Sequence, residues 1–184
     1  MLYLIGVGLK PSHLTAEAQE ALQNCLDIFL ETYTSQFAEG TVKELENRIG
    51  KKINLLKRKN VEEEFGELLK KAKNEDVSLL VFGNPLIATT HIQLLLEAKK
   101  RKVAVQVVPG ISIVDLLGKT GLDAYKFGRI CTIVFQEPQY SPESFFETIE
   151  RNFHNGFHSL CLLDIRAEEK RLMGIPEAVG ILQK

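Results

Sequence analysis

Two apolar runs of this chain end in glycine turns, and this pattern constrains the fold more than any other feature. Leu2 to Val7 leads into the turn Gly6-Val7-Gly8, and Val77 to Phe82 leads into Gly83-Asn84-Pro85. Continuous apolar runs of this length are typical of strands buried on both faces of a parallel sheet. Because ligands bind beyond the carboxyl ends of strands in open α/β sheets, the two turns indicate a binding edge.

A helix is expected directly after the second turn. Thr89 and Thr90 precede His91 and a segment with helical spacing that runs to Lys100. Threonine side chains cap helix N-termini well, so we expect the helix to span 89–100. The same residues also suit an ordinary strand-to-helix connection with no ligand, and the sequence leaves both interpretations open.

The remaining segments alternate between strand and helix patterns. We expect strands at 2–7, 27–31, 53–56, 77–82, 103–108, 130–135 and 159–165, and helices at 15–25, 41–49, 61–73, 89–100, 111–117, 142–153 and 175–182. Ser141 is a plausible cap of the helix at 142–153. This order predicts an α/β fold with a mostly parallel, doubly wound sheet.

The strands are unevenly distributed along the chain, which predicts two domains. Residues 1–112 hold most of them and form an N-terminal α/β domain. Residues 113–184 hold two strands and two long helices, and no strand follows the last helix. Because so few strands make only a small sheet, we expect the start of a second α/β domain that is incomplete in a chain truncated at Lys184. A natural short form is the alternative.

Composition narrows the function classes. The chain has 184 residues, 45% of them hydrophobic, and a net charge of −1, which supplies no basic field for nucleic acid or anionic lipid. Basic runs such as 99–102 fall at expected helix ends or loops, although a local docking patch for RNA or protein is the alternative. The cysteines Cys25, Cys131 and Cys161 lie far apart in apolar runs, which favours a reduced, cytoplasmic protein. No apolar run approaches the length that spans a membrane, so we expect no membrane span.

Several familiar active-site patterns are missing. The four histidines have no metal-ligand spacing, and no Gly-x-Ser-x-Gly motif indicates a nucleophilic serine. Gly6-Val7-Gly8 lacks the third glycine of a dinucleotide-binding turn, and Pro11 stands in its place. Asp164, at a strand end and followed by Arg166, is either functional, a cap of the next turn or the partner of an arginine. Tyr33-Thr34-Ser35 follows the second strand, and its hydroxyls either line a pocket or stabilise a turn.

Five motifs in order carry a resemblance that covers essentially the whole chain. They are Leu2-Tyr-Leu-Ile-Gly-Val-Gly-Leu9, Glu31-Thr-Tyr-Thr-Ser35, Gly83-Asn-Pro-Leu-Ile-Ala-Thr-Thr-His91, Thr120-Gly-Leu-Asp-Ala-Tyr-Lys-Phe-Gly128 and Leu163-Asp-Ile-Arg166. With these motifs the chain resembles the diphthine synthase branch of the tetrapyrrole methylase superfamily. The Pro-Leu-x-Ala-Thr-Thr-His motif and the Thr-Gly-Leu…Tyr-x-Phe-Gly motif separate this branch from the porphyrin and corrin methylases.

The resemblance implies a two-domain methyltransferase that works as a homodimer and binds S-adenosylmethionine between its domains. The implied substrate is translation elongation factor 2, whose target histidine carries a 3-amino-3-carboxypropyl group. The enzyme would methylate the amine of that group repeatedly. Carried over by motif position, the implied cofactor contacts are Leu9, Asn84, Ile87, Ser112, Ile113 and Leu163.

Methyl transfer of this kind needs a neutral amine and no nucleophilic residue. The sequence offers three candidates for the group that takes the amine's proton, namely Asp164, Tyr33 and His91, and does not choose among them. Tyr33 and Tyr125 are candidates for aromatic contacts to a methylated ammonium.

Two departures from the family pattern leave alternatives open. Asn84 stands where the family usually has aspartate, and Pro109-Gly110 is closer to the wider superfamily than to this branch. Loss of a charged hydrogen bond at Asn84 would cost about 1–3 kcal/mol of cofactor affinity. A catalytically weak relative that acts as a binding or scaffold protein is therefore the first alternative, and a methylase of small tetrapyrroles is the second.

Overall fold

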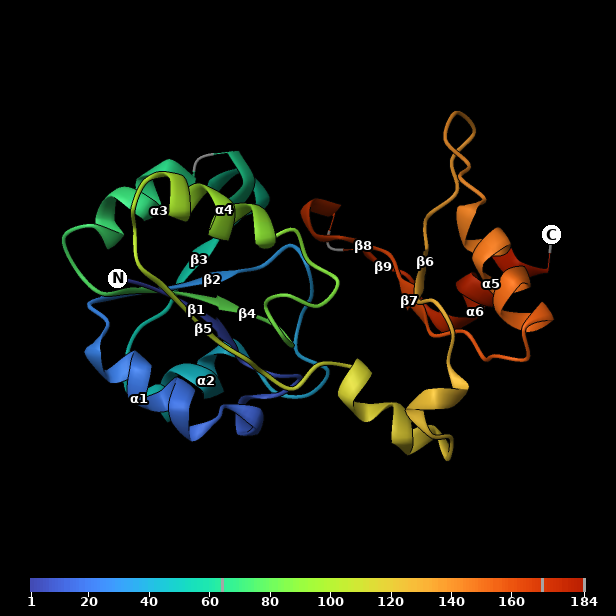
Figure 1. The fold of residues 1–184 in the computed structure, drawn as a ribbon, viewed down its shortest axis with the longest axis horizontal. Coiled ribbons are helices and arrows are strands. Elements are labelled where there is room, and N and C mark those ends of the chain that lie inside the picture. The colour runs from blue at the N-terminus through green and yellow to red at the C-terminus, as the bar shows by residue number, and fades with distance from the viewer. Residues whose placement is uncertain (64, 170, 184) are drawn as a thin grey trace. The chain divides into compact units, whose positions relative to one another are not determined.

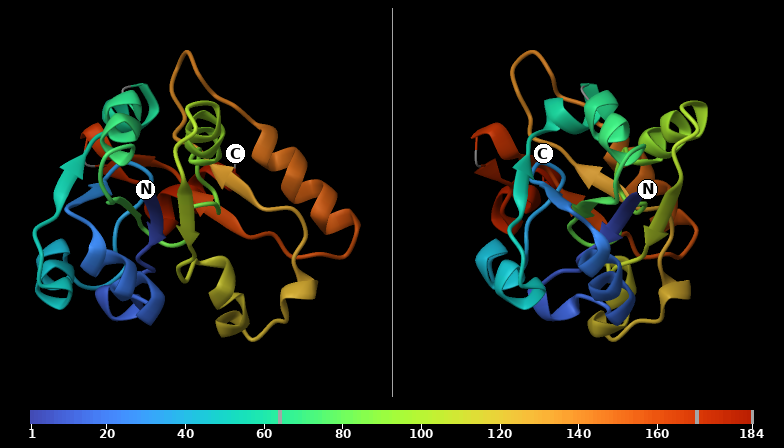
Figure 2. Two further views of the ribbon diagram at one scale, coloured as in Figure 1. Left: turned by 60° about the vertical axis from the view of Figure 1, so that its left-hand side comes forward. Right: turned by 90° about the vertical axis from the view of Figure 1, so that its left-hand side faces the viewer.

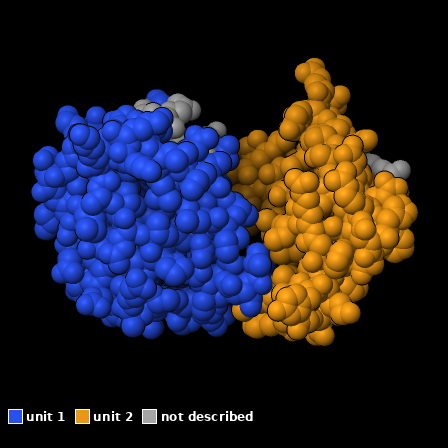
Figure 3. Space-filling view, in the orientation of Figure 1, with its two compact units in different colours: residues 1–115 blue, residues 116–184 orange. Residues whose placement is uncertain are grey.

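The computed structural model describes residues 1–63, 65–169 and 171–183. The chain forms two compact units, Met1–Asp115 and Leu116–Lys184, which we call unit 1 and unit 2 (Figure 3). The sequence-based boundary after Ser112 lies just before this division.

Unit 1 is built on one sheet of five parallel strands. The strands are β1 (Leu2–Gly6), β2 (Asp27–Glu31), β3 (Asn54–Leu56), β4 (Val77–Val81) and β5 (Val105–Val108). Their order is β3-β2-β4-β1-β5, and every neighbouring pair is parallel. The mostly parallel sheet expected from the apolar runs is therefore confirmed.

Helices cover both faces of this sheet, so unit 1 is doubly wound as predicted. Figures 1 and 2 show α1 (Ala16–Asn24) and α2 (Val42–Ile49) on one face, and α3 (Phe65–Ala72) and α4 (Ile92–Lys100) on the other. Leu22 of α1, Leu45 of α2 and Leu80 of β4 belong to one fully buried apolar cluster. Two short helices complete the unit, η1 (Pro11–His13) and the π-helical turn η2 (Lys59–Glu63).

Local signals set several helix ends in unit 1. Thr15 caps α1 by accepting from the Ala18 amide, and Thr41 caps α2 by accepting from the Glu44 amide. Gly50 ends α2 in the left-handed conformation, with φ of 76°.

Two other predicted helices in unit 1 begin differently. The helix expected at 61–73 is replaced by η2 and α3, with residue 64 outside the described part of the chain. The helix expected from Thr89 starts at Ile92, and neither threonine serves as its N-cap. The prediction was wrong there because the hydroxyl of Thr89 donates to the Pro85 carbonyl at 2.6 Å.

Unit 2 contains less sheet. Its elements are η3 (Val114–Thr120), which begins at the division, η4 (Ala124–Lys126), β6 (Cys131–Ile133), α5 (Ser144–His154), β7 (Cys161–Leu163), β8 (Ile165–Arg166), η5 (Ala167–Glu169), β9 (Arg171–Leu172) and α6 (Ile175–Leu182). β6 and β7 pair in parallel, and β8 and β9 pair antiparallel. The core gathers Phe145 and its neighbours Ile133, Met173 and Ile181.

Two expectations for unit 2 need correction, and the structure adds a contact between two cysteines. The helix expected at 111–117 is the 3-10 helix η3, which starts at Val114. Ser141 does not cap α5, because its hydroxyl bonds to the Gln136 side chain instead. Cys131 and Cys161, distant in sequence, face each other across β6 and β7, with their sulfur atoms 3.7 Å apart.

Candidate functional site

The loops that follow β1, β4 and β5 meet at the carboxyl edge of the unit 1 sheet. Gly8 and Gly83 exchange two backbone hydrogen bonds, at 3.2 Å and 2.9 Å. A side chain on Gly6 or Gly110 would overlap neighbouring backbone, since a Cβ on Gly110 would lie 2.2 Å from the Gly83 carbonyl oxygen. The glycines of the Gly6-Val7-Gly8 turn therefore serve the close packing of three loops, which explains that turn without a dinucleotide.

The loop after β4 is held by its own side chains. Asn84 Oδ1 accepts from the Leu86 amide at 3.0 Å, and the Asn84 carbonyl accepts from the Ile87 amide at 3.3 Å. The Pro85 carbonyl oxygen accepts from Thr89 Oγ1 at 2.6 Å and lies 3.2 Å from His91 Nδ1. This loop also holds Ala88 at φ of 56°, a conformation that side-chain-bearing residues seldom adopt.

The loop after β5 is fixed by a buried serine. Ser112 is 4% exposed, and its hydroxyl oxygen accepts from the Val114 amide at 3.2 Å. The Ser112 amide donates to Asp115 Oδ2 at 2.6 Å. Ile113, between these anchors, remains 46% exposed although it is apolar. The loop thus offers one hydroxyl proton and one apolar side chain at the sheet edge.

The structure brings five of the six residues expected to contact the cofactor to one edge. Leu9, Asn84, Ile87, Ser112 and Ile113 all lie in the loops that follow β1, β4 and β5, which are neighbours in the sheet. Leu163, the sixth, ends β7 in unit 2 and packs there against the Phe145 core. The edge is mostly apolar and carries a few polar groups, as in many small-molecule sites.

The three candidate proton acceptors have different environments. Asp164 accepts from the Phe135 amide at 3.0 Å and the Ile165 amide at 2.9 Å, one bond to each oxygen, so it fixes a strand end. Arg166, two residues beyond Asp164, forms its ion pairs with Glu137 at 2.5 Å and with Glu169 at 3.5 Å. Tyr33 and His91 are 4% and 2% exposed, and their ring centroids lie 6.4 Å apart.

The two candidate aromatic contacts also differ. The guanidinium of Arg58 lies 5.3 Å from the centroid of the Tyr33 ring, so a cation already contacts that ring. Tyr125 is 87% exposed at η4 in unit 2.

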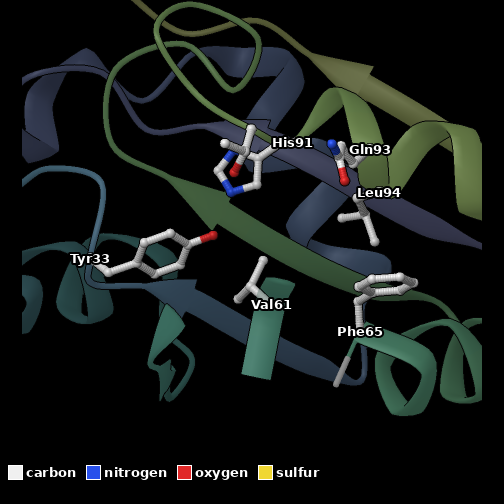
Figure 4. Close-up of a pocket in the computed structure, with 7 residues that line it drawn as sticks. Tyr33, Val61, Phe65, His91, Gln93 and Leu94 are labelled. Carbon is white, nitrogen blue, oxygen red and sulfur yellow. The ribbon is translucent and has the colours of Figure 1, made fainter. Parts of the chain in front are cut away.

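Tyr33 and His91 line a pocket of about 190 Å³ in unit 1 (Figure 4). Its other lining residues are Val61, Phe65, Thr90, Gln93 and Leu94. Sequence reasoning missed Val61 and Phe65, because their spacing is that of an ordinary amphipathic helix. The useful signal is that η2 and α3 follow β3, the neighbour of β2, which brings them near Tyr33.

The described part of the chain offers neither a metal-binding group nor a membrane-spanning helix. Over the residues that the structure describes, histidine, cysteine and acidic side chains form no group of three that could hold a metal ion. No helix in that part of the chain combines the length and apolar character needed to span a membrane.

Comparison with known proteins identifies the class. The sequence profile of the Tetrapyrrole (Corrin/Porphyrin) Methylases matches residues 1–184. The chain is 40% identical over 185 residues to the diphthine synthase of Methanocaldococcus jannaschii, covering 99% of this chain and 72% of that protein. It is 42% identical over 173 residues to the diphthine methyl ester synthase of Mus musculus, covering 94% of this chain and 61% of that protein. A crystal structure of diphthine synthase matches 99% of this chain and 70% of its own, with a TM-score of 0.88 and 31% identity.

The chain therefore belongs to the tetrapyrrole methylase family and has its two-unit α/β fold. Within that family its relatives are diphthine synthases, so it is an S-adenosylmethionine-dependent methyltransferase of diphthamide biosynthesis. The resemblance carried by the five motifs is confirmed.

Proposed function

We propose that this chain methylates the amino group of the modified histidine of translation elongation factor 2, with S-adenosylmethionine as methyl donor. The observation that carries the proposal is the convergence of Leu9, Asn84 and Ser112 on neighbouring strand ends of one sheet. The names of the similar proteins support the same pathway.

The polar groups at this edge fit the proposed cofactor. Asn84 uses its Oδ1 within the loop, so its Nδ2 amide is the group that can donate outward. The Ser112 hydroxyl accepts from Val114, which leaves its proton as a donor to a ribose or carboxylate oxygen. Leu9, Ile87 and Ile113 supply apolar surface for an adenine ring. Leu163 is proposed as the contact from unit 2.

The chain's task in this reaction is positioning. When bound, S-adenosylmethionine supplies a methyl group on an already activated sulfonium, so no covalent intermediate with the protein is required. The loop after β4 holds Asn84 and Ile87 in place through the two bonds to the Pro85 carbonyl. Water exclusion and orientation of the amine remain for the protein to provide.

Calorimetric titration with S-adenosylmethionine is the first test, with the Asn84→Asp variant beside the wild type. Aspartate keeps the oxygen that accepts from Leu86 and replaces the outward amide with a second carboxylate oxygen. A charged hydrogen bond to a ribose hydroxyl or to the cofactor's ammonium is stronger by about 1–2 kcal/mol, so the variant should bind about tenfold tighter. Absence of binding by both forms would contradict the enzyme function for this chain.

Transfer is then followed by mass spectrometry of elongation factor 2 that carries the 3-amino-3-carboxypropyl group. The expected result is stepwise addition of methyl groups that resist mild alkali, as N-methyl groups do. Binding of the cofactor without any transfer would instead favour the catalytically weak relative.

A carboxyl oxygen is a second candidate acceptor, because the mouse and human relatives are named diphthine methyl ester synthase. A methyl ester adds the same mass as an N-methyl group but is hydrolysed in mild alkali. Loss of one methyl group from the product after alkaline treatment would therefore show that this chain also esterifies the substrate.

We also propose a homodimer in the cytoplasm, on the strength of the family resemblance and of three cysteines that are free thiols. Light scattering at several protein concentrations tests the homodimer, and a constant monomer mass would contradict it.

A further inference from the structure

The pocket of unit 1 lies where β2 and β4 end, beside the loop that carries Asn84. Tyr33 follows β2, Val61 belongs to η2, and Phe65 begins α3. Thr90 and His91 precede α4, and Gln93 and Leu94 lie in its first turn. Its floor is buried, since Val61 and Leu94 are each 3% exposed. Its rim is exposed and polar, formed by Thr90 and Gln93. A ligand group that enters past this rim therefore leaves water for a largely apolar floor.

His91 is the buried polar side chain that this pocket exposes to a ligand. Its Nδ1 lies 3.2 Å from the Pro85 carbonyl oxygen, which can only accept a hydrogen bond. Nδ1 therefore carries the proton of the neutral ring, and Nε2 carries the lone pair. In Figure 4 the ring of His91 and the hydroxyl of Tyr33 point toward one another in the pocket.

The same carbonyl bond ties this pocket to the proposed cofactor edge. Asn84 and Ile87 lie between β4 and His91 on one loop, and Pro85 lies at its centre. Thus one short loop presents cofactor contacts at one end and a proton acceptor at the other. The described lining residues include no acidic or basic side chain besides His91, and such a desolvated floor favours the neutral form of an amine.

We propose that this pocket is the acceptor subsite, and that His91 Nε2 takes the proton that the acceptor ammonium must lose before methyl transfer. The proposal rests on the methyltransferase function proposed above, and the ligand class is a primary amine on a flexible side chain of a protein substrate. Tyr33 and Thr90 provide hydroxyl groups that orient the amine.

The step balances as follows. An N–H bond of the ammonium breaks, and its proton moves to His91 Nε2, which leaves a neutral amine and an imidazolium. The amine lone pair forms the new N–C bond, while the C–S bond breaks and its electron pair stays on sulfur. The product nitrogen then carries the positive charge, and His91 releases its proton to water at the rim.

The His91→Asn variant tests the proposal most directly. Asparagine keeps an N–H donor near the position of Nδ1, so it can still bond the Pro85 carbonyl, but it has nothing at Nε2. Removal of a general base typically slows turnover by about 10²–10⁴-fold, so kcat should fall at least about 100-fold. The dissociation constant of S-adenosylmethionine should change little, since the loop remains closed.

Three further variants separate catalysis from structure. Thr89→Val removes the other bond to the Pro85 carbonyl and leaves His91 in place, so it should weaken cofactor binding more than it lowers kcat. His154→Asn makes the same chemical change at an exposed residue of α5 and should leave kcat unchanged. His91→Ala vacates room for free imidazole, which should restore part of the lost rate, an effect that a merely structural histidine does not show.

The outcomes decide between the two proposals. If the wild type methylates elongation factor 2 and His91→Asn does so at the same rate, the acceptor subsite is wrong and the function stands. The subsite is equally contradicted if His91→Asn only weakens cofactor binding, as Thr89→Val does, and imidazole restores nothing to His91→Ala. If the wild type binds the cofactor and transfers no methyl group, the function itself fails, and the subsite with it.

Discussion

Units 1 and 2 differ in how completely they bury their sheets. In unit 1, β4 lies between two strands and is buried at all five positions. In unit 2, β7 has a single described neighbour and is half-buried at all three positions. Among the residues that the structure describes, nine of the sixteen exposed large apolar side chains belong to unit 2, which is much the smaller unit.

The difference shows where each unit obtains its stability. Unit 1 relies on apolar burial between a sheet and helices on both faces. Unit 2 has a smaller apolar core, and its buried Asn152, 5% exposed, bonds both backbone groups of Arg129. The binding edge and the pocket both lie on unit 1, so a rigid scaffold supports the proposed chemistry.

Deleting a core leucine should affect unit 1 most. Leu80 is fully buried in β4, so Leu80→Ala should lower the free energy of unfolding by about 2–5 kcal/mol. Leu163→Ala in half-buried β7 should cost less than half as much. Urea unfolding followed by circular dichroism measures both, and hydrogen exchange assigns each loss to its unit. Equal losses would remove the contrast between the units.

The buried asparagine of unit 2 should come next. Asn152→Leu leaves the Arg129 amide and carbonyl without their partner, which should cost about 1–3 kcal/mol of unfolding free energy. Asn155→Ala, at an exposed residue just beyond the same helix, is the matched control and should change stability by less than about 0.5 kcal/mol. If Asn152→Leu leaves the free energy of unfolding unchanged, apolar packing alone stabilises unit 2.

Helix caps provide a smaller test. Thr41 accepts from the Glu44 amide at 3.2 Å, so Thr41→Ala in unit 1 should cost about 1 kcal/mol. Ser141→Ala in unit 2 should cost less than about 0.5 kcal/mol, because that serine caps no helix. Thermal unfolding of the two variants makes the comparison. A larger loss of stability for Ser141→Ala would indicate that Ser141 caps α5 as predicted.

Alkaline pH provides a further test, at a thiol of unit 2. Burial, with the neighbouring Cys161 thiol, raises the pKa of the Cys131 thiol from 9.0 to about 12. Its contribution to stability is therefore complete below pH 9 and is lost as the pH rises toward 12, since the unfolded chain releases the proton first. Unfolding free energies measured from pH 8 to 11 should fall less steeply for Cys131→Val than for the wild type. Identical slopes would show that this thiol does not contribute.

Much of unit 1 was predictable because its signals are local. The strand at 27–31 and the helix at 41–49 end where short-range patterns, the Thr41 cap and Gly50 place them. The binding edge followed from the rule that parallel strands end on one side, whereas the choice of Leu9, Asn84 and Ser112 as cofactor contacts came from the family resemblance.

The predictions failed where the partner of a residue is set by the folded structure and not by a local sequence pattern. Thr89 has a good capping side chain, but the fold of its loop puts the Pro85 carbonyl within reach of the hydroxyl. The two-residue strands β8 and β9 are too short for any periodicity to show. The pairing of Cys131 with Cys161 depends on strand register, which no local pattern specifies.

The position of β1 in the sheet has a consequence for synthesis of the chain. Leu2 pairs with Val77 on one side and with Val105 on the other, so the first strand to be made is among the last to find both partners. At about 5–20 residues per second, β1 leaves the ribosome on the order of 5–20 s before β5 exists to complete the sheet. During that interval its apolar residues depend on nascent-chain chaperones, and folding of unit 1 should begin only when β4 has emerged.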